Sequence, residues 1–177
     1  KNYFNHAILD MKIKLSPPDC HQIDLTNSQT GQYMGKAIYT RICVTHKKGQ
    51  IAKNVEIIIS KVLKLNRNNK WVRVKSFLPM NLKWSHIGSQ TVTIPPKSFR
   101  HCDLGSFRQN SIVTNFLIDT IVQPNPVSNG AIPNLLTPGD YLFECVLSGE
   151  NIKPQIKKWK ISFNPNWSQN EKTMLNK

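Results

Sequence analysis

The stretch from Tyr39 to Val62 constrains the fold of this chain more than any other part of the sequence. Two runs of β-branched and apolar residues flank a short polar turn, Lys47–Gln50, which contains one glycine. In the second run, apolar residues at 55, 57 and 59 alternate with Glu56 and Ser60. Because successive side chains of a strand point to opposite faces, this period of two predicts strands with one buried face.

Turn signals recur along the chain, and the segments between them predict seven to nine short strands. These short strands favour an antiparallel all-β sandwich over an α/β fold, because the sequence contains only one clear helix signal. The predicted strands span 8–15, 37–45, 55–65, 71–77, 90–94, 99–104, 115–122, 140–147 and 157–163. We expect the last two to form a hairpin.

The segments between the predicted strands are interpreted as loops at 24–35 and 123–139. The apolar segment 78–89 is either a short strand or a loop folded over one end of the sheets. Ser168 and Glu171 have the spacing of a capping box, which predicts a short helix over 170–176.

The predicted organisation is a single domain with short flanking segments. Residues 1–7 form a lead-in, residues 8–165 form the sandwich, and residues 166–177 form a helical tail. A chain of 177 residues is long enough for one hydrophobic core, and no apolar run approaches the ~20 residues of a membrane-spanning helix. Since residue 1 is Lys and not Met, we expect a processed or excised piece, which leaves open a targeting or membrane segment in front of it.

The formal charge of +14 is unevenly distributed. Residues 61–108 contain ten Lys or Arg and one acid, whereas residues 109–152 contain four acids and neither Lys nor Arg. Such asymmetry steers proteins toward anionic surfaces. The alternative is an ordinary solvated face, which the excess of 19 Lys over 5 Arg favours, because specific phosphate recognition usually employs arginine.

The basic strand pair 61–75 is the candidate binding surface, with Lys70, Trp71, Arg73 and Lys75 as its anion- or partner-binding residues. Alternation places Trp71, Arg73 and Lys75 on one face, where cations attract phosphates and the indole offers a stacking surface. The alternative is an edge strand whose lysines prevent sheet-to-sheet aggregation.

Four cysteines stand at 20, 43, 102 and 145, and none has the close spacing of a zinc or redox motif. We expect free thiols, which suit a reducing compartment, although the sequence leaves three disulfide pairings open. The five histidines are scattered singly, so no metal site and no cofactor is inferred.

Two short groups contain the residue types of nucleophilic catalysis, Ser85-His86 and His101-Cys102-Asp103. Adjacent strand residues point to opposite faces, so His101 and Cys102 do not face one another, whereas His101 and Asp103 share a side. No catalytic residue is assigned, and we expect a protein that is not an enzyme.

Two segments resemble immunoglobulin-like sandwich domains. Arg41-Ile-Cys-Val-Thr-His46, followed by Gly49 and Asn54-Val-Glu-Ile57, resembles a bacterial signature in which a strand, a glycine turn and a second strand follow one another. Leu136-Thr-Pro-Gly-Asp-Tyr141 resembles the approach to the penultimate strand of immunoglobulin-like and fibronectin-like domains. The resemblance implies structural roles for Gly49 and Gly139, and a hydroxyl of Tyr141 that bonds back to the preceding loop, the tyrosine corner.

The segments Leu78–Ser85 and Phe99–Gly105 are similar to parts of uncharacterised bacterial proteins, some of which have a membrane-anchoring N-terminus. We therefore expect a non-enzymatic binding module with a protein partner, at the cytoplasmic face of a membrane-anchored bacterial protein. The alternative is nucleic-acid or anionic-lipid binding through residues 61–75. No small-molecule substrate is inferred, and the oligomeric state stays open.

Overall fold

The computed structural model describes residues 6–109, 115–127 and 130–169, and it shows an all-β protein. Its strands are β1 (Ile8–Lys12), β2 (Cys20–Thr26), β3 (Tyr33–Lys48), β4 (Ala52–Leu65), β5 (Trp71–Arg73), β6 (Met80–Asn81), β7 (Val92–Ile94), β8 (Phe99–Arg108), β9 (Asn115–Ile118), β10 (Leu135–Leu136), β11 (Gly139–Ser148) and β12 (Gln155–Phe163). The strands pair antiparallel throughout. The count exceeds the seven to nine expected because several strands are only two or three residues long.

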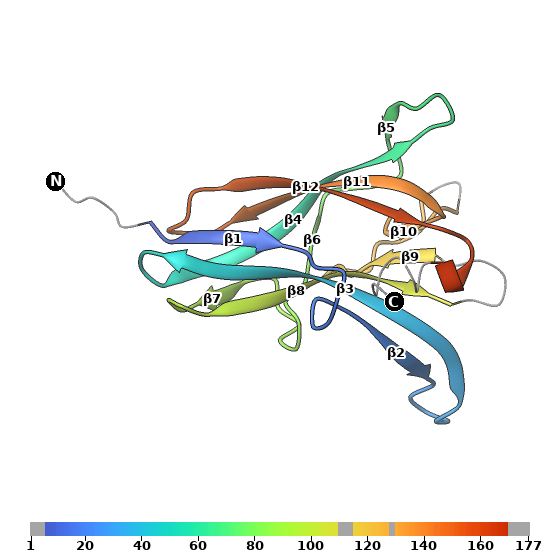
Figure 1. The fold of residues 1–177 in the computed structure, drawn as a ribbon, viewed down its shortest axis with the longest axis horizontal. Helices are drawn as coiled ribbons and strands as arrows, with labels where there is room; N and C mark the ends of the chain where they lie inside the picture. The colour runs from blue at the N-terminus through green and yellow to red at the C-terminus, as the bar shows by residue number, and fades with distance from the viewer. Residues whose placement is uncertain (1–5, 110–114, 128–129, 170–177) are drawn as a thin grey trace.

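The strands form two sheets that face each other across the core (Figure 1). The first sheet has the order β1-β3-β8-β9-β10, and β2 also pairs with β3. The second has the order β12-β11-β4-β5, and β6 and β7 also pair with β4. The long strand β3 pairs with β2 along its first half and with β1 along its second half, so β2 extends away from the rest of the first sheet.

The two β-rich runs that dominate the sequence become β3 and β4, which belong to different sheets. The turn between them therefore carries the chain from one layer to the other. The alternation holds as predicted, since Val55, Ile57 and Ile59 of β4 are fully buried. The core between the layers also contains an aromatic cluster of Phe107, Phe116, Tyr141, Phe143 and Phe163.

Several predicted boundaries were wrong. The expected loop 24–35 is partly strand, because β2 runs to Thr26 along the edge of β3 and β3 itself begins at Tyr33. The strand predicted over 71–77 ends at Arg73, since the amide of Phe77 turns back to the carbonyl oxygen of Val74 at 3.1 Å. The strand predicted to reach residue 122 ends at Ile118.

The predicted helix over 170–176 and Glu171 lie outside the described residues. The last described residues, 167–169, have helical backbone. The side-chain oxygen of Asn166 accepts bonds from the amide (3.0 Å) and the hydroxyl (2.7 Å) of Ser168. Asn166 therefore caps the helical turn that begins at residue 167. Within the described ranges, no helix has the length and apolar character that crossing a bilayer requires.

One side of the molecule is joined across the two sheets by polar contacts between β1 and β12. The ammonium of Lys157 donates to the Asp10 carboxylate and to the carbonyl oxygen of Met11, both at 2.6 Å. The side-chain amide of Gln155 donates to the carbonyl oxygen of Leu9 at 2.8 Å. These contacts connect the first strand of one sheet to the edge strand of the other.

The pH dependence of stability should report on this contact. The hydrogen bond from Lys157 holds the pKa of the Asp10 carboxyl below its ordinary value. A carboxyl with a depressed pKa stabilises the fold above the pKa of an unfolded aspartate, about 3.9, and this stabilisation is lost as the pH falls through the folded pKa. We expect Asp10→Asn to lower the unfolding free energy at pH 7 by about 0.5–1 kcal/mol, since the pair is partly exposed, and to have a smaller effect near pH 3. Urea unfolding at pH 7 and at pH 3 measures the loss of unfolding free energy in each case. Asp24→Asn, at an exposed position, is the control. An equal loss for Asp10→Asn at both pH values would contradict the prediction.

Candidate functional site

The predicted binding residues lie on a projecting hairpin, which we call the basic arm (residues 61–75). The end of β4 pairs with β5 through Leu65–Trp71, Lys64–Val72 and Leu63–Arg73. In Figure 1, β5 and the turn before it extend beyond the body of the second sheet.

The turn of the basic arm is organised by one asparagine. The Asn66 side-chain oxygen accepts from the amides of Asn68 and Lys70, both at 2.9 Å. The main-chain amide of Asn66 donates to the carbonyl oxygen of Lys70 at 2.9 Å, and Asn69 has a positive φ of 56°. Asparagine accepts this backbone and satisfies the local main-chain donors, which is why the Asn cluster makes a defined turn.

The arm exposes apolar and cationic side chains together. Because it extends past the sheet, all three residues of β5 are exposed, with Trp71 at 38 % and Val72 at 45 %. Strand β5 therefore has no buried face. Val74, which follows it, packs partly against the core. An open groove of about 530 Å³ follows the arm and is lined by Lys64, Leu65, Asn66, Arg67, Val72, Arg73 and Val74.

The cations of the arm divide into two groups. Two of them have partners on the body of the protein: Lys61 lies 3.4 Å from the Glu144 carboxylate, and Lys64 donates to the Thr137 hydroxyl at 3.0 Å. The other four cations of the arm have no carboxylate partner within the described part of the chain; they are Arg67 and Lys70 in the turn, Arg73 on β5 and Lys75 just after it. The basic arm therefore carries uncompensated positive charge beside exposed apolar surface.

The second predicted group, His101-Cys102-Asp103, lies on β8. Cys102 is fully buried, while His101 and Asp103 point to the outer face of the first sheet, as the alternation predicts. Asp103 accepts a bond from the Ser85 hydroxyl at 2.5 Å and lies 3.3 Å from the Arg41 guanidinium. The Ser85 hydroxyl is thus bonded to a carboxylate that is itself paired.

The buried cysteines lack the character of nucleophiles. Burial raises the pKa of Cys102 well above its usual range and that of Cys20 to about 11. Reactive cysteines have depressed pKa values beside cations or helix N-termini. All four cysteines are free thiols in the structure.

A group that the spacing did not reveal lies on the same outer face. Cys43 of β3 and His101 of β8 are directly opposite each other in the antiparallel register. Asp19, just before β2, places a carboxylate oxygen 2.9 Å from Nε2 of His101. One donor atom from each of Asp19, Cys43 and His101 lies within 4.8 Å of the others. Asp19 and His101 are 82 residues apart, so no local sequence motif exists by which the group could be found.

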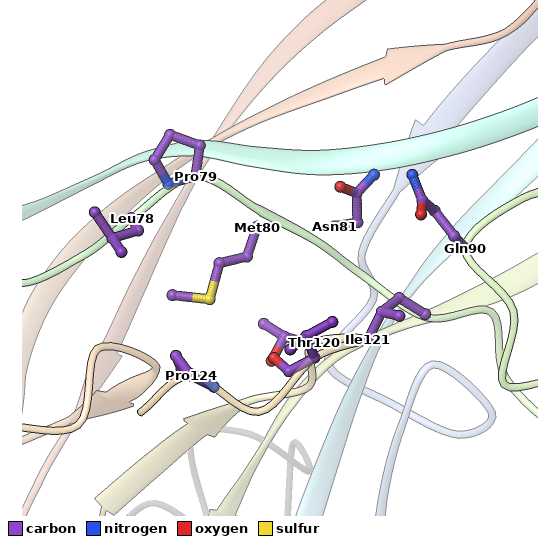
Figure 2. Close-up of a pocket in the computed structure, with 9 residues that line it drawn as sticks. Leu78, Pro79, Met80, Asn81, Gln90, Thr120, Ile121 and Pro124 are labelled. Carbon is purple, nitrogen blue, oxygen red and sulfur yellow. The ribbon is translucent and has the colours of Figure 1, made fainter. Parts of the chain in front are cut away.

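A second groove, of about 280 Å³, lies where the 78–89 segment meets the chain after β9 (Figure 2). The Ile121 amide donates to the carbonyl oxygen of Asn81 at 3.1 Å, which joins the segments. Figure 2 shows the amide groups of Asn81 and Gln90 side by side, and both donate to Glu56 at 3.0 Å. The segment expected as a strand or a loop is thus a two-residue strand, β6, followed by turns.

Comparisons with known proteins give no family. No model of a protein family matches the chain, and no curated protein matches it. Among solved structures, the chain is similar to one described as "X-ray structure of Northeast Structural Genomics Consortium target SoR45". The alignment has 14 % identity and a TM-score of 0.37, and it covers 88 % of this chain and 86 % of that one.

Proposed function

We propose that this chain is a non-enzymatic binding module with an immunoglobulin-like sandwich, which engages an acidic protein partner through the exposed cations and apolar residues of the basic arm. The strand order supports the immunoglobulin-like architecture. The central order β1-β3-β8 in one sheet and β12-β11-β4 in the other corresponds to A-B-E and G-F-C of that fold. The Tyr141 hydroxyl donates to the carbonyl oxygen of Thr137 at 2.7 Å, which is the bond of a tyrosine corner.

The observation that carries the proposal is the combination of uncompensated cations and exposed apolar surface on the basic arm. Protein interfaces are commonly anchored by Trp and Arg, with a polar rim around an apolar centre. Trp71 and Arg73 supply both anchor types, and the groove beside Val72 offers an apolar recess. The positive rim favours an acidic partner, because complementary charge steers association.

A protein partner is favoured over nucleic acid by the composition of the arm. Single-stranded nucleic acids are bound on several aromatic platforms in succession, whereas the basic arm contains one aromatic residue, Trp71. Its groove also contains aliphatic walls, from Leu65, Val72 and Val74, that suit apolar side chains of a protein. Nucleic acid or anionic lipid is the competing outcome of the test below.

Photo-crosslinking in the native cell tests the proposal. A photoreactive residue in place of Val72 should capture a protein, and the product should survive nuclease and lipid extraction. Arg73→Glu with Lys75→Glu should lower the yield or the affinity roughly 100-fold, because two attractive pairs become repulsive.

The matched control reverses two exposed lysines elsewhere, Lys153→Glu in the connection before β12 with Lys160→Glu on β12. This control changes the net charge equally and should leave capture unchanged. Products sensitive to nuclease or lipid extraction would replace the protein partner with the alternative. If the crosslinking yield at Val72 does not exceed that of a probe at Ile156 on β12, the assignment of the basic arm as the binding surface would be overturned.

A further inference from the structure

The group of Asp19, Cys43 and His101 is held in place by the main chain of three segments. The carbonyl oxygen of Asp19 accepts from the Arg41 amide at 2.7 Å, which fixes the residue against β3. The second carboxylate oxygen of Asp19 accepts from the amide of Lys14 at 3.3 Å. Asp19 is 4 % exposed, so its carboxylate is both buried and aimed at His101.

The other two donors come from neighbouring strands. Directly opposite residues of an antiparallel pair have Cβ atoms roughly 5 Å apart, which brings the Cys43 thiol and the His101 imidazole onto one patch. The rings of His101 and Phe99 form a T-shaped contact with 5.5 Å between centroids, which restricts rotation of the imidazole. Cys43 is half-buried, and its sulfur lies 3.8 Å from the Thr45 hydroxyl.

The donors form the set that zinc uses in proteins: one imidazole nitrogen, one thiolate and one carboxylate oxygen. A tetrahedral zinc ion with bonds of about 2.0–2.3 Å separates its ligand atoms by roughly 3.3–3.8 Å. The three donor atoms lie within 4.8 Å of one another, so small side-chain rotations bring them to these separations.

Charge also matches. A buried ion is tolerated where the charges around it compensate. One carboxylate and one thiolate together neutralise a divalent cation, which is important in a chain of formal charge +14.

We propose that Asp19, Cys43 and His101 bind a zinc-class divalent ion, with water as the fourth ligand. On binding, the Cys43 thiol releases its proton to solvent, and Nε2 of His101 coordinates the ion in the tautomer whose proton is on Nδ1. The ion would join the segment before β2 to β3 and β8, and it would stabilise the outer face of the first sheet. The site is independent of the basic arm.

Cobalt titration of the reduced, untagged protein tests the site. Co²⁺ bound through a thiolate gives an intense charge-transfer absorption in the near ultraviolet, so binding by Cys43 has its own signature. We expect one equivalent of Co²⁺ to produce this band, and Zn²⁺ to displace it. Zn²⁺ should also raise the melting temperature of the wild-type protein.

Near-isosteric variants separate ligation from folding. Cys43→Ser should abolish the band, and Asp19→Asn and His101→Gln should each weaken Co²⁺ binding at least about 100-fold, since loss of a second-shell partner alone costs about 10–100-fold. Cys145→Ala and His86→Gln are controls that should retain both the band and the zinc-dependent melting shift. Circular dichroism establishes that each variant folds. Absence of the band in the wild-type protein, or its persistence in folded Cys43→Ser, would overturn the proposal.

Discussion

Phe116→Ala is expected to lower the free energy of unfolding by about 3–5 kcal/mol, the usual cost of removing a buried phenylalanine ring. Phe116 is fully buried on β9 of the first sheet. Its ring centroid lies 4.6 Å from that of Phe107 in the same sheet, and 5.9 Å and 6.2 Å from those of Phe143 and Phe163 in the second sheet. The ring therefore joins the two layers, and its removal leaves a cavity that neither layer can close alone.

A glycine of the neighbouring strand explains why the site holds a ring of this size. A Cβ placed on Gly105 of β8 would lie 2.6 Å from the Cζ atom of Phe116, so the ring packs directly on the glycine backbone. This close packing leaves little freedom for neighbours to relax into the space that Phe116→Ala creates.

Urea unfolding monitored by tryptophan fluorescence measures the loss. Phe99→Ala is the matched control, since it deletes the same ring at a position that is 55 % exposed, and it should cost less than about 1 kcal/mol. Equal losses for the two variants would show that Phe116 does not occupy the buried position described.

The parts of the fold that were predicted correctly are those whose pattern is contained in one segment. In β4, β11 and β12, the burial of alternate residues comes from one face meeting the core, so the sequence period reports the structure directly. The hairpin of β11 and β12 also follows, because its strands are close in sequence and pair in a simple register.

The parts of the fold that were predicted wrongly depend on pairing with another strand. Residues 20–26 contain polar side chains at His21, Gln22 and Asp24, and no fully buried face beyond Cys20. They are a strand because the first half of β3 offers an edge to pair with. Strand formation of this kind comes from tertiary context and not from the propensity of the segment.

The candidate sites divide in the same way. The basic arm could be proposed from the sequence because its cations and its turn asparagines all lie within residues 61–75. The Asp19–Cys43–His101 group depends on the register between β3 and β8 and on the path of the chain before β2. Alternation showed that His101 faces outward, but its partner Asp19 is known only from the fold.

A substitution in the turn between β3 and β4 is expected to cause the second large loss of stability. Gly49 has a φ of +95°, and a Cβ at this position would collide with the carbonyl oxygen of His6 and lie 3.0 Å from its carbonyl carbon. The lead-in to β1 cannot withdraw freely, because the amide of Ala7 is bonded to the carbonyl oxygen of Asn151 at 2.9 Å. Any side chain at position 49 therefore strains the backbone and also displaces the start of β1.

We expect Gly49→Ala to cost about 2–4 kcal/mol, which combines the conformational strain of a non-glycine residue at this φ with the steric clash. Gly31→Ala separates the two contributions, because Gly31 also has a positive φ, +68°, but a Cβ there meets nothing within 4 Å. That control should cost only about 1 kcal/mol, the conformational term alone. Urea unfolding of both variants gives the comparison: a difference of less than about 0.5 kcal/mol would mean that the lead-in does not press against this turn, and that the glycine serves backbone conformation only.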